Sequence, residues 1–399
     1  MLKHITIKGY KSIKELDLDL SPINVLIGAN GSGKSNFISF FKLLSWMMRS
    51  PGQLQYFIGQ AGGANSFLFD GAALTKKIQA NLQLEHVSGQ YNYSFKLDYA
   101  ASDTFIFSEE KFDDLSNSFS ENVGSKNTSF IAEYPNIQKL DNSSLNLRMI
   151  NSNLANERIS LSGHRESRLI DLATSGNQIA RNIFFLMQRF ASYQFHDTSQ
   201  TARFKQRCSI YDYHYLQEDA GNLAAFLLKI RDYQPRYYQR IVETIRQIAP
   251  FFADFVLSPM SNTILLQWQE IGTDLVFSPH QASDGTLRAM SLVTLLLQPP
   301  DSLPDVLILD EPELGLHPYA INIIGSLINS VSNRCQVILA TQSPLLVDCF
   351  EPEDIIVVQR NNRQSNFNRL DISSLEEWLE EYSLSELWDK NVIGGRPSR

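Results

Sequence analysis

The feature that most constrains the fold is a glycine-rich loop, Gly28-Ala29-Asn30-Gly31-Ser32-Gly33-Lys34-Ser35, between two segments of different character. Residues 23–27, just before it, are continuously apolar, as in a strand buried on both faces of a sheet. From Lys34 to about Met48, apolar residues recur at helical spacing without Gly or Pro. A buried strand, a GxxxxGKS loop and a helix N-terminus together point backbone N–H groups at a phosphate. We therefore predict a nucleoside triphosphate site in an α/β fold.

Each position of the loop has a predicted role. Gly28, Gly31 and Gly33 permit the backbone conformations of an anion nest, to which Ser32 contributes its backbone. Lys34 neutralises the β- and γ-phosphates and is a predicted catalytic residue, and the Ser35 hydroxyl is a predicted ligand of Mg²⁺. A chance glycine turn is the competing interpretation, but the eight-position match in its required setting disfavours it.

A second candidate site, made of two acidic residues, follows another apolar segment. Residues 305–309 are almost entirely apolar and end in Asp310 and Glu311, at the strand edge where open α/β sheets bind ligands. Asp310 is expected to hold Mg²⁺, and Glu311 to orient or deprotonate the attacking water. Two adjacent carboxylates could equally begin a turn. The phosphate loop in the same chain favours the catalytic interpretation.

The order of these elements resembles one family. About 275 residues separate the loop from the acidic strand, and Ser283-Asp284-Gly285-Thr286 stands at a helix start between them. This order resembles the ABC-type ATPase heads of the RecF, SMC and OLD-like group. The resemblance implies that Ser283, Asp284 and Gly285 contact the ATP of an opposite protomer, in a homodimer that sandwiches ATP between its heads. Taken alone, Ser283 is better explained as a helix N-cap.

The resemblance extends to further motifs. Residues 7–13 look like the family's first strand and turn, and Asn30 and Asn36 fit its extended loop pattern. Residues 313–318 resemble the D-loop that lies across the dimer interface. Gln342 occupies the position of a switch histidine, so it can hydrogen-bond a γ-phosphate or a water, but it cannot titrate.

Most of the chain is similar to a bacterial group of predicted RecF-like ATPases, described as AAA_21- or AAA_15-like. The similarity rests on residues 193–199, 221–224 and 283–288 and on the Gly-Gly-Arg-Pro segment that starts at Gly394, which reads as an exposed end. Either Gln194 or His196 would supply the contact that a Q-loop makes to Mg²⁺ or nucleotide. A buried structural turn is an equally good interpretation of that segment.

At 399 residues the chain exceeds the size of a single hydrophobic core, about 250–300 residues, so an insertion is expected. We predict an ATPase head split in two, with residues 1–112 carrying the loop and an antiparallel β subdomain and residues 251–399 carrying the other motifs. Between them, 113–250 is predicted to form an inserted, mainly helical lobe. Its first part, 113–176, reads as loops and short helices, followed by helices over 178–192 and 219–249. Ser373 and Glu376 offer a capping box for one final helix.

Charge and cysteine content limit the classes of partner and compartment. The net charge of −8 argues against bulk coating of nucleic acid, although the basic stretch 181–246 could form a local DNA-binding patch. A solvated helical face explains that stretch slightly better. No apolar run reaches the length of about 20 residues that a membrane span needs, and the three cysteines are isolated. We therefore expect a cytoplasmic protein without a membrane partner.

Three hypotheses of function follow. The first is a Mg²⁺-dependent ATPase that acts as a dimeric switch in DNA repair, DNA maintenance or anti-phage defence. The second is a sensor or regulatory subunit that binds a separately encoded effector protein and has little direct contact with DNA. The third, a transporter subunit, has the weakest support because LSGGQ and the switch histidine are altered. With only 359–399 after the last predicted core strand, we expect no appended nuclease domain. We also expect no long coiled coil, because no sustained heptad run separates the two halves of the head.

Overall fold

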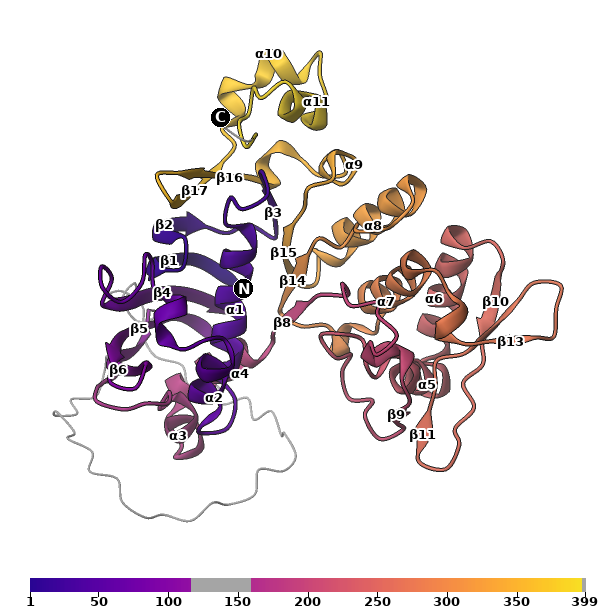
Figure 1. The fold of residues 1–399 in the computed structure, drawn as a ribbon, viewed down its shortest axis with the longest axis horizontal. Coiled ribbons are helices and arrows are strands. Elements are labelled where there is room, and N and C mark those ends of the chain that lie inside the picture. The colour runs from indigo at the N-terminus through magenta and orange to yellow at the C-terminus, as the bar shows by residue number, and fades with distance from the viewer. Residues whose placement is uncertain (116–158, 397–399) are drawn as a thin grey trace, which may run out of the picture.

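The computed structural model describes residues 1–115 and 159–396, which form two masses joined through a central sheet (Figure 1). The first mass contains an antiparallel sheet with helix α1 (Lys34–Met47) lying along it. The second is a lobe built mainly from helices, on the other side of the central sheet. The predicted motifs lie on strands of the central sheet and on the helices of the two masses that pack beside it.

The central sheet, called the core sheet below, is mostly parallel. Its strands in spatial order are β17 (Gln364–Arg369), β16 (Ile355–Asn361), β3 (Ile23–Ile27), β15 (Gln336–Ala340), β14 (Val306–Asp310) and β8 (Phe190–Tyr193). All neighbouring strands from β16 to β8 pair in parallel, and β17 pairs antiparallel with β16. Because parallel strands end at the same edge, the residues that follow β3, β14 and β15 come together there.

Side chains of the core strands alternate between two hydrophobic cores. On β14, Val306 and Ile308 belong to the core shared with α1 and the antiparallel sheet, whereas Leu307 and Leu309 belong to the core shared with the lobe. Both faces of the sheet are therefore covered. This explains why the sequences of these strands are apolar throughout rather than alternating.

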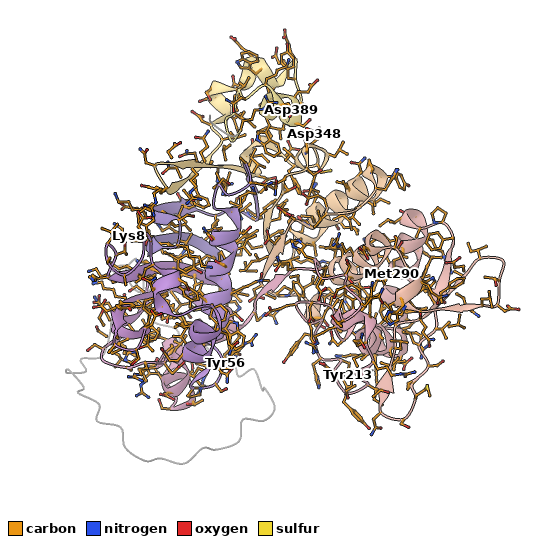
Figure 2. The ribbon with its side chains drawn as sticks, in the orientation of Figure 1. Lys8, Tyr56, Tyr213, Met290, Asp348 and Asp389 are labelled. Carbon is orange, nitrogen blue, oxygen red and sulfur yellow. The ribbon has the colours of Figure 1, made fainter. Side chains whose placement is uncertain are left out.

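The antiparallel sheet confirms the predicted β subdomain. Its strands in spatial order are β2 (Ile13–Asp19), β1 (Leu2–Tyr10), β4 (Lys77–His86), β5 (Gly89–Ala100), β6 (Thr104–Asp114) and β7 (Ile159–Leu161). One face packs on α1, where the rings of Phe40 and Phe95 stack with centroids 6.4 Å apart. The opposite face is polar and carries exposed side chains such as Lys8 (Figure 2). Helices α2 (Gln53–Gln60), α3 (Leu169–Thr174) and α4 (Gln178–Gln188) complete this mass.

The lobe packs helices against short strand pairs. Its helices are α5 (Leu223–Tyr233), α6 (Pro235–Ile248), α7 (Asp284–Leu297) and, beside the core sheet, α8 (Pro318–Val331). Its strands are β9 (Cys208–Ser209), β10 (Phe252–Phe255), β11 (Thr263–Ile264), β12 (Trp268–Glu270) and β13 (Val276–Phe277). Met290 of α7 is fully buried among the side chains of this core (Figure 2). Pro235 begins α6, so the segment predicted as helical over 219–249 forms two helices that meet at this proline.

Two predictions about the middle of the chain require correction. The helix expected over 178–192 ends at Gln188, and the next residues form β8, which pairs in parallel with β14. Arg189 marks the change, since its guanidinium binds Asp305 and the Leu303 carbonyl at the base of β14. The division at 113–250 also differs from the topology, because β7 extends the antiparallel sheet and β8 completes the core sheet. Of the loops and short helices predicted over 113–176, residues 116–158 lie outside the described part.

The prediction of one final helix is also wrong. The segment forms two short helices, α10 (Glu376–Leu379) and α11 (Leu384–Asp389). Ser373 is engaged with Asp371, at 2.7 Å, instead of capping a helix at Glu376. The capping box is built by Ser383 and Glu386 at the start of α11. A further helix, α9 (Pro344–Val347), follows the end of β15. No helix within 1–115 and 159–396 has the length and apolar character to cross a membrane.

A buried carboxylate fixes the end of the antiparallel sheet. Glu110 of β6 is fully buried and accepts hydrogen bonds from the Tyr93 hydroxyl at 2.8 Å and the Ser167 hydroxyl at 2.5 Å. His164 lies 2.8 Å from its other oxygen, which also accepts from the Arg168 N–H at 3.0 Å. These bonds compensate for the loss of hydration and hold residues 164–168 against the sheet.

Replacing Glu110 by alanine would leave the buried polar groups of Tyr93, His164 and Ser167 without their shared acceptor. We expect the free energy of unfolding to fall by about 3 kcal/mol, measured by urea denaturation. Glu85, in an exposed ion pair with Lys3 on the same sheet, is the matched control. Glu85→Ala should change stability by less than about 0.5 kcal/mol. Equal effects of the two substitutions would contradict a structural role for the Glu110 cluster.

Candidate active site

The phosphate loop is shaped by three glycines with positive φ. Gly28, Gly31 and Gly33 have φ values of 148°, 76° and 117°, which side chains on L-residues disfavour. A Cβ at Gly28 would lie 2.2 Å from the Val358 carbonyl oxygen, so the close approach of β16 also requires glycine. No side chain caps the start of α1, which begins at Lys34. The first N–H groups of that helix therefore remain for an anionic ligand.

Lys34 lies between the loop and the acidic strand end. Its ammonium group is buried and donates hydrogen bonds to the carbonyls of Gly28 at 2.6 Å and Ala29 at 3.2 Å. Burial lowers the pKa of Lys34, and the charges of Glu311 and Asp310 act in the opposite direction. The lysine predicted to contact phosphate and the two predicted carboxylates therefore occupy one site.

Glu311 and Gln342 are in direct contact. Glu311 follows β14 with a φ of 45°, and its N–H donates to the Ala340 carbonyl at 2.8 Å. This backbone bond ties the end of β14 to the end of β15. The Gln342 amide, just beyond β15, donates a hydrogen bond to the Glu311 carboxylate. The structure thus joins the predicted catalytic carboxylate with the residue at the switch position.

Asp310 borders a chain of polar groups that leads to α1. Its Oδ2 accepts from the Gln194 amide at 3.4 Å, and the same amide nitrogen lies 3.1 Å from His196 Nδ1. His196 Nε2 is 3.0 Å from the Asp310 carbonyl oxygen, so a proton on Nε2 satisfies both contacts. Lys42 of α1 donates to the Gln194 carbonyl oxygen at 3.1 Å. Both candidates for the Q-loop contact therefore lie beside Asp310.

Glu313 is a second buried acid at this edge. Its Oε1 accepts from the Thr341 hydroxyl at 2.6 Å and from the Gln342 N–H at 3.1 Å. Burial raises the pKa of Glu313 and also that of Asp310. Glu313 thereby holds the start of the predicted D-loop against the segment that presents Gln342.

The turn at Ser283 is built as an N-cap. The Ser283 hydroxyl accepts from the Thr286 N–H at 3.2 Å, as a helix-capping serine should. Asp284 lies 3.9 Å from the buried Lys205 ammonium. A Cβ at Gly285 would lie 2.4 Å from the Gly315 carbonyl oxygen, so the turn packs directly on the predicted D-loop. Its hydroxyl and carboxylate remain exposed.

Arg288 lies within the motif at 283–288 and has a role in the site that the sequence did not predict. Its guanidinium donates to the carbonyls of Phe195 at 3.0 Å, His196 at 2.9 Å and Leu314 at 2.9 Å. One side chain of α7 thus joins the Q-loop candidates to the predicted D-loop. The sequence offers only an arginine five positions after Ser283. Arginines at such positions are too common in helices to identify a site residue.

The basic stretch 181–246 is spread over several elements instead of forming one surface. Arg189 and Arg203 pair with Asp305 and Asp219, and Lys205 is buried in the lobe. Arg236 and Arg240 are exposed one turn apart on α6. These positions favour the solvated-face interpretation over a continuous groove for DNA.

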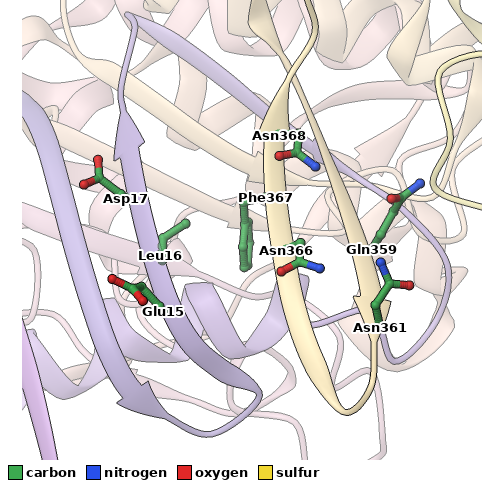
Figure 3. Close-up of a pocket in the computed structure, with 8 residues that line it drawn as sticks. All are labelled: Glu15, Leu16, Asp17, Gln359, Asn361, Asn366, Phe367 and Asn368. Atoms are coloured by element: carbon green, nitrogen blue, oxygen red, sulfur yellow. The ribbon is translucent and has the colours of Figure 1, made fainter.

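A pocket of about 250 Å³ lies apart from this site, between β2 and the hairpin of β16 and β17 (Figure 3). Its lining residues are Glu15, Leu16, Asp17, Gln359, Asn361, Asn366, Phe367 and Asn368. None of them belongs to the phosphate loop or to the acidic strand end. A smaller cavity of about 10 Å³ lies at the candidate active site itself, where His196, Arg288, Asp310 and Glu311 line it.

The residues present fit a triphosphate with a bound divalent cation. Ser32 Oγ in the loop and Asp310 Oδ1 at the strand end are buried and have no hydrogen-bond partner among the described residues. Buried polar atoms are normally satisfied by protein, water or a bound ligand, so both atoms are free to contact a nucleotide or its cation. Within the same residues no group of three or more His, Cys, Asp or Glu could hold a metal.

Comparisons with known proteins place the chain in a family. Residues 23–348 match the family described as "AAA domain, putative AbiEii toxin, Type IV TA system". The match covers most of the chain, and the protein belongs to this AAA domain family. The OLD nuclease of Thermus scotoductus (strain ATCC 700910 / SA-01) is 22% identical over 422 residues, which span 99% of this chain and 68% of that protein.

Solved structures confirm the fold. The SMC head bound to the C-winged helix domain of ScpA superposes with a TM-score of 0.58 at 13% identity, covering 94% of this chain and 99% of that one. The SMC head with an extended coiled coil bound to the C-terminal domain of ScpA, from Pyrococcus furiosus, has a TM-score of 0.53 at 13% identity and covers 95% and 98%. The chain thus has the fold of these SMC heads, and its similarity to an OLD nuclease agrees with the resemblance of its motifs to RecF, SMC and OLD-like heads.

The contact between Gly285 and Gly315 gives a test of this site. Gly285→Ala should lower the free energy of unfolding by about 1–3 kcal/mol, because the new methyl group collides with the Gly315 carbonyl. Gly59 of α2 is the control, since a Cβ there meets nothing within 4 Å. Gly59→Ala should stabilise the protein by about 0.5–1 kcal/mol. Chemical denaturation measures both, and a gain at both positions would refute the close packing.

Proposed function

We propose that the protein is a Mg²⁺-dependent ATPase that works as a dimeric switch. The observation that carries this proposal is the convergence of Lys34, Glu311 and Gln342 at one edge of the core sheet. Lys34 is electrostatically coupled to Glu311, which is hydrogen-bonded to Gln342. Membership of the AAA domain family supports nucleotide hydrolysis as the reaction.

The site residues divide the task of hydrolysis. The phosphate loop and the N-terminus of α1 would bind the triphosphate, with contributions from Asn30 and Asn36. Ser35 and Asp310 would hold Mg²⁺, which supplies positive charge beside the phosphate oxygens. Glu311, oriented by Gln342, would accept a proton from the attacking water. Because the amide of Gln342 cannot titrate, its role is to hold Glu311 and the water in place.

The position of the turn formed by Ser283, Asp284 and Gly285, called the signature turn below, supports a dimer. Ser283, Asp284 and Gly285 make their contacts with the lobe and with Gly315, whereas the phosphate loop makes its contacts with the β16–β17 hairpin. Exposed apolar side chains follow the strand ends that carry Glu311 and Gln342. They are Leu314, Tyr319 and Leu345. A second copy of the chain could cover them and bring its own signature turn to the bound ATP.

The biological setting is part of the proposal. The similarity to an OLD nuclease supports a role in DNA maintenance or anti-phage defence in the cytoplasm. Both SMC heads have a domain of ScpA bound, which supports an effector protein as the partner of the switch. Direct DNA binding has less support because the basic residues of 181–246 are dispersed.

Lys34→Ala should weaken ATP binding at least about 100-fold, because it removes the buried cation that faces the phosphates. Glu311→Gln should keep ATP binding and lower the rate of hydrolysis about 100-fold or more, since the general base is lost. With hydrolysis blocked, the Glu311→Gln protein should accumulate as a dimer in ATP, measured by light scattering. Intact ATP binding by the Lys34→Ala protein, or a monomeric Glu311→Gln protein in ATP, would contradict the proposal.

The choice between DNA and a protein effector can be tested through the ATPase rate. If DNA is the direct partner, duplex DNA should accelerate hydrolysis and the effect should fall steeply with salt. Replacing Arg236 and Arg240 of α6 by glutamine should then reduce the acceleration. We expect no acceleration at physiological salt, in line with a protein partner. A salt-sensitive acceleration that these two substitutions abolish would favour DNA instead.

A further inference from the structure

The β16–β17 hairpin lies against the outer side of the phosphate loop, and no predicted role involves it. The Val358 carbonyl faces Gly28, and the Arg360 guanidinium donates to the Gly31 carbonyl at 3.3 Å. Ser365 of β17 is fully buried, and a Cβ at Gly33 would lie 2.0 Å from its hydroxyl oxygen. The hairpin thus contacts the loop at its beginning, its middle and its end.

A chain of buried hydrogen bonds runs from α1 through the hairpin to the loop. The Asn36 amide donates to the Ser12 hydroxyl at 2.7 Å, and the Ser12 and Ser365 hydroxyls are 2.7 Å apart. The Ser365 hydroxyl lies 2.5 Å from the Ser32 carbonyl oxygen. Each hydroxyl has one proton. All three contacts are satisfied only when Asn36 donates to Ser12, Ser12 to Ser365, and Ser365 to Ser32.

This order fixes the direction of one peptide group in the loop. The described chain has no cis peptide bond, so the Ser32 carbonyl and the Gly33 N–H point to opposite sides of the peptide plane. Ser365 holds the carbonyl on the hairpin side, which turns the Gly33 N–H away from the hairpin. In an anion nest the N–H groups must converge on the ligand while the carbonyls face outward.

We propose that Ser365, supported by Ser12, is a positioning residue for the phosphate loop and sets its affinity for the triphosphate. This inference rests on the proposed ATPase function. Ser365 contacts no reacting atom and acts through the Ser32–Gly33 peptide. Ser12 joins the same chain from the turn between β1 and β2, which is anchored to Ser365 by a second bond, from the Ser365 N–H to the Ser12 carbonyl at 2.8 Å.

The test compares Ser365→Ala, Ser12→Ala and the double variant in steady-state ATP hydrolysis. Ser365→Ala should raise KM for ATP about fivefold to tenfold, because the neutral hydrogen bond to the loop is lost. Ser12→Ala should raise KM less, about twofold to threefold, because Ser365 keeps its bond to Ser32 and loses only the support of Ser12. Both changes should leave kcat within about twofold. The double variant should raise KM no further than Ser365→Ala does, since both residues act through one chain. Thr244→Val is the control, because it removes a buried hydroxyl of α6 that bonds only the Arg240 carbonyl, at 2.8 Å.

The result that overturns the inference is an unchanged KM in Ser365→Ala, or a KM that rises as much in Thr244→Val. Multiplicative effects of the two serine changes would also overturn it, because the residues would then act separately. Should Ser365→Ala fail to fold, Ser12→Ala alone still decides the question, since it breaks the same chain from the other end. Lys34→Ala, measured in parallel, separates the two proposals. Lost binding there with a normal KM in Ser365→Ala would leave the ATPase standing and remove only the role of Ser365.

Discussion

The constraint on which the structure depends is the parallel pairing of β3, β15 and β14 in one sheet buried on both faces. Each strand is only a few residues long, and its apolar side chains divide between two separate cores. The register is therefore fixed, because a shift by one residue would exchange the side chains facing each core. Fixed register places the first residue after each strand at one edge. The chemistry of the site is the consequence of that alignment.

The first mass and the lobe are also tied to this edge by side chains. Gln194 links Asp310 to Lys42 of α1, and Arg288 links α7 to the segments on either side of Asp310. The lobe therefore shares hydrogen bonds with the segments that flank the predicted catalytic carboxylates. A change in the orientation of α7 would be felt at Asp310 and at Gly315 together, which is the coupling that a switch between two states requires.

The sequence motifs could place the phosphate loop and the two carboxylates in one predicted site because these residues stand directly at strand ends. A glycine loop after 23–27 and two carboxylates after 306–309 carry their own structural context, so the fold brings them together as expected. Ser365 and Arg288 could not be predicted, because their roles depend on contacts distant in the sequence. Ser365 bonds residues 333 and 353 positions away, and Arg288 bonds residues 26 to 93 positions away. The strand β8 was mistaken for a helix end because a short aromatic run fits both patterns until its pairing with β14 is known. The prediction of one final helix is wrong because Ser373 and Ser383 are both followed three residues later by glutamate, and only Ser383 caps a helix.

The segment at Gly394 and Gly395 lies close enough to the phosphate loop to report ligand binding by fluorescence. The sequence suggested an exposed end, but Gly395 is buried, and a Cβ there would come within 3.5 Å of the Gly28 Cα and 3.1 Å of the Trp388 indole nitrogen. The neighbouring Arg396 is exposed. A fluorescent probe attached at position 396 would sit one residue from the back of the phosphate loop. The indole of Trp388 provides a natural emitter at the same place, so the arrival of a ligand could be followed optically without labelling the site itself.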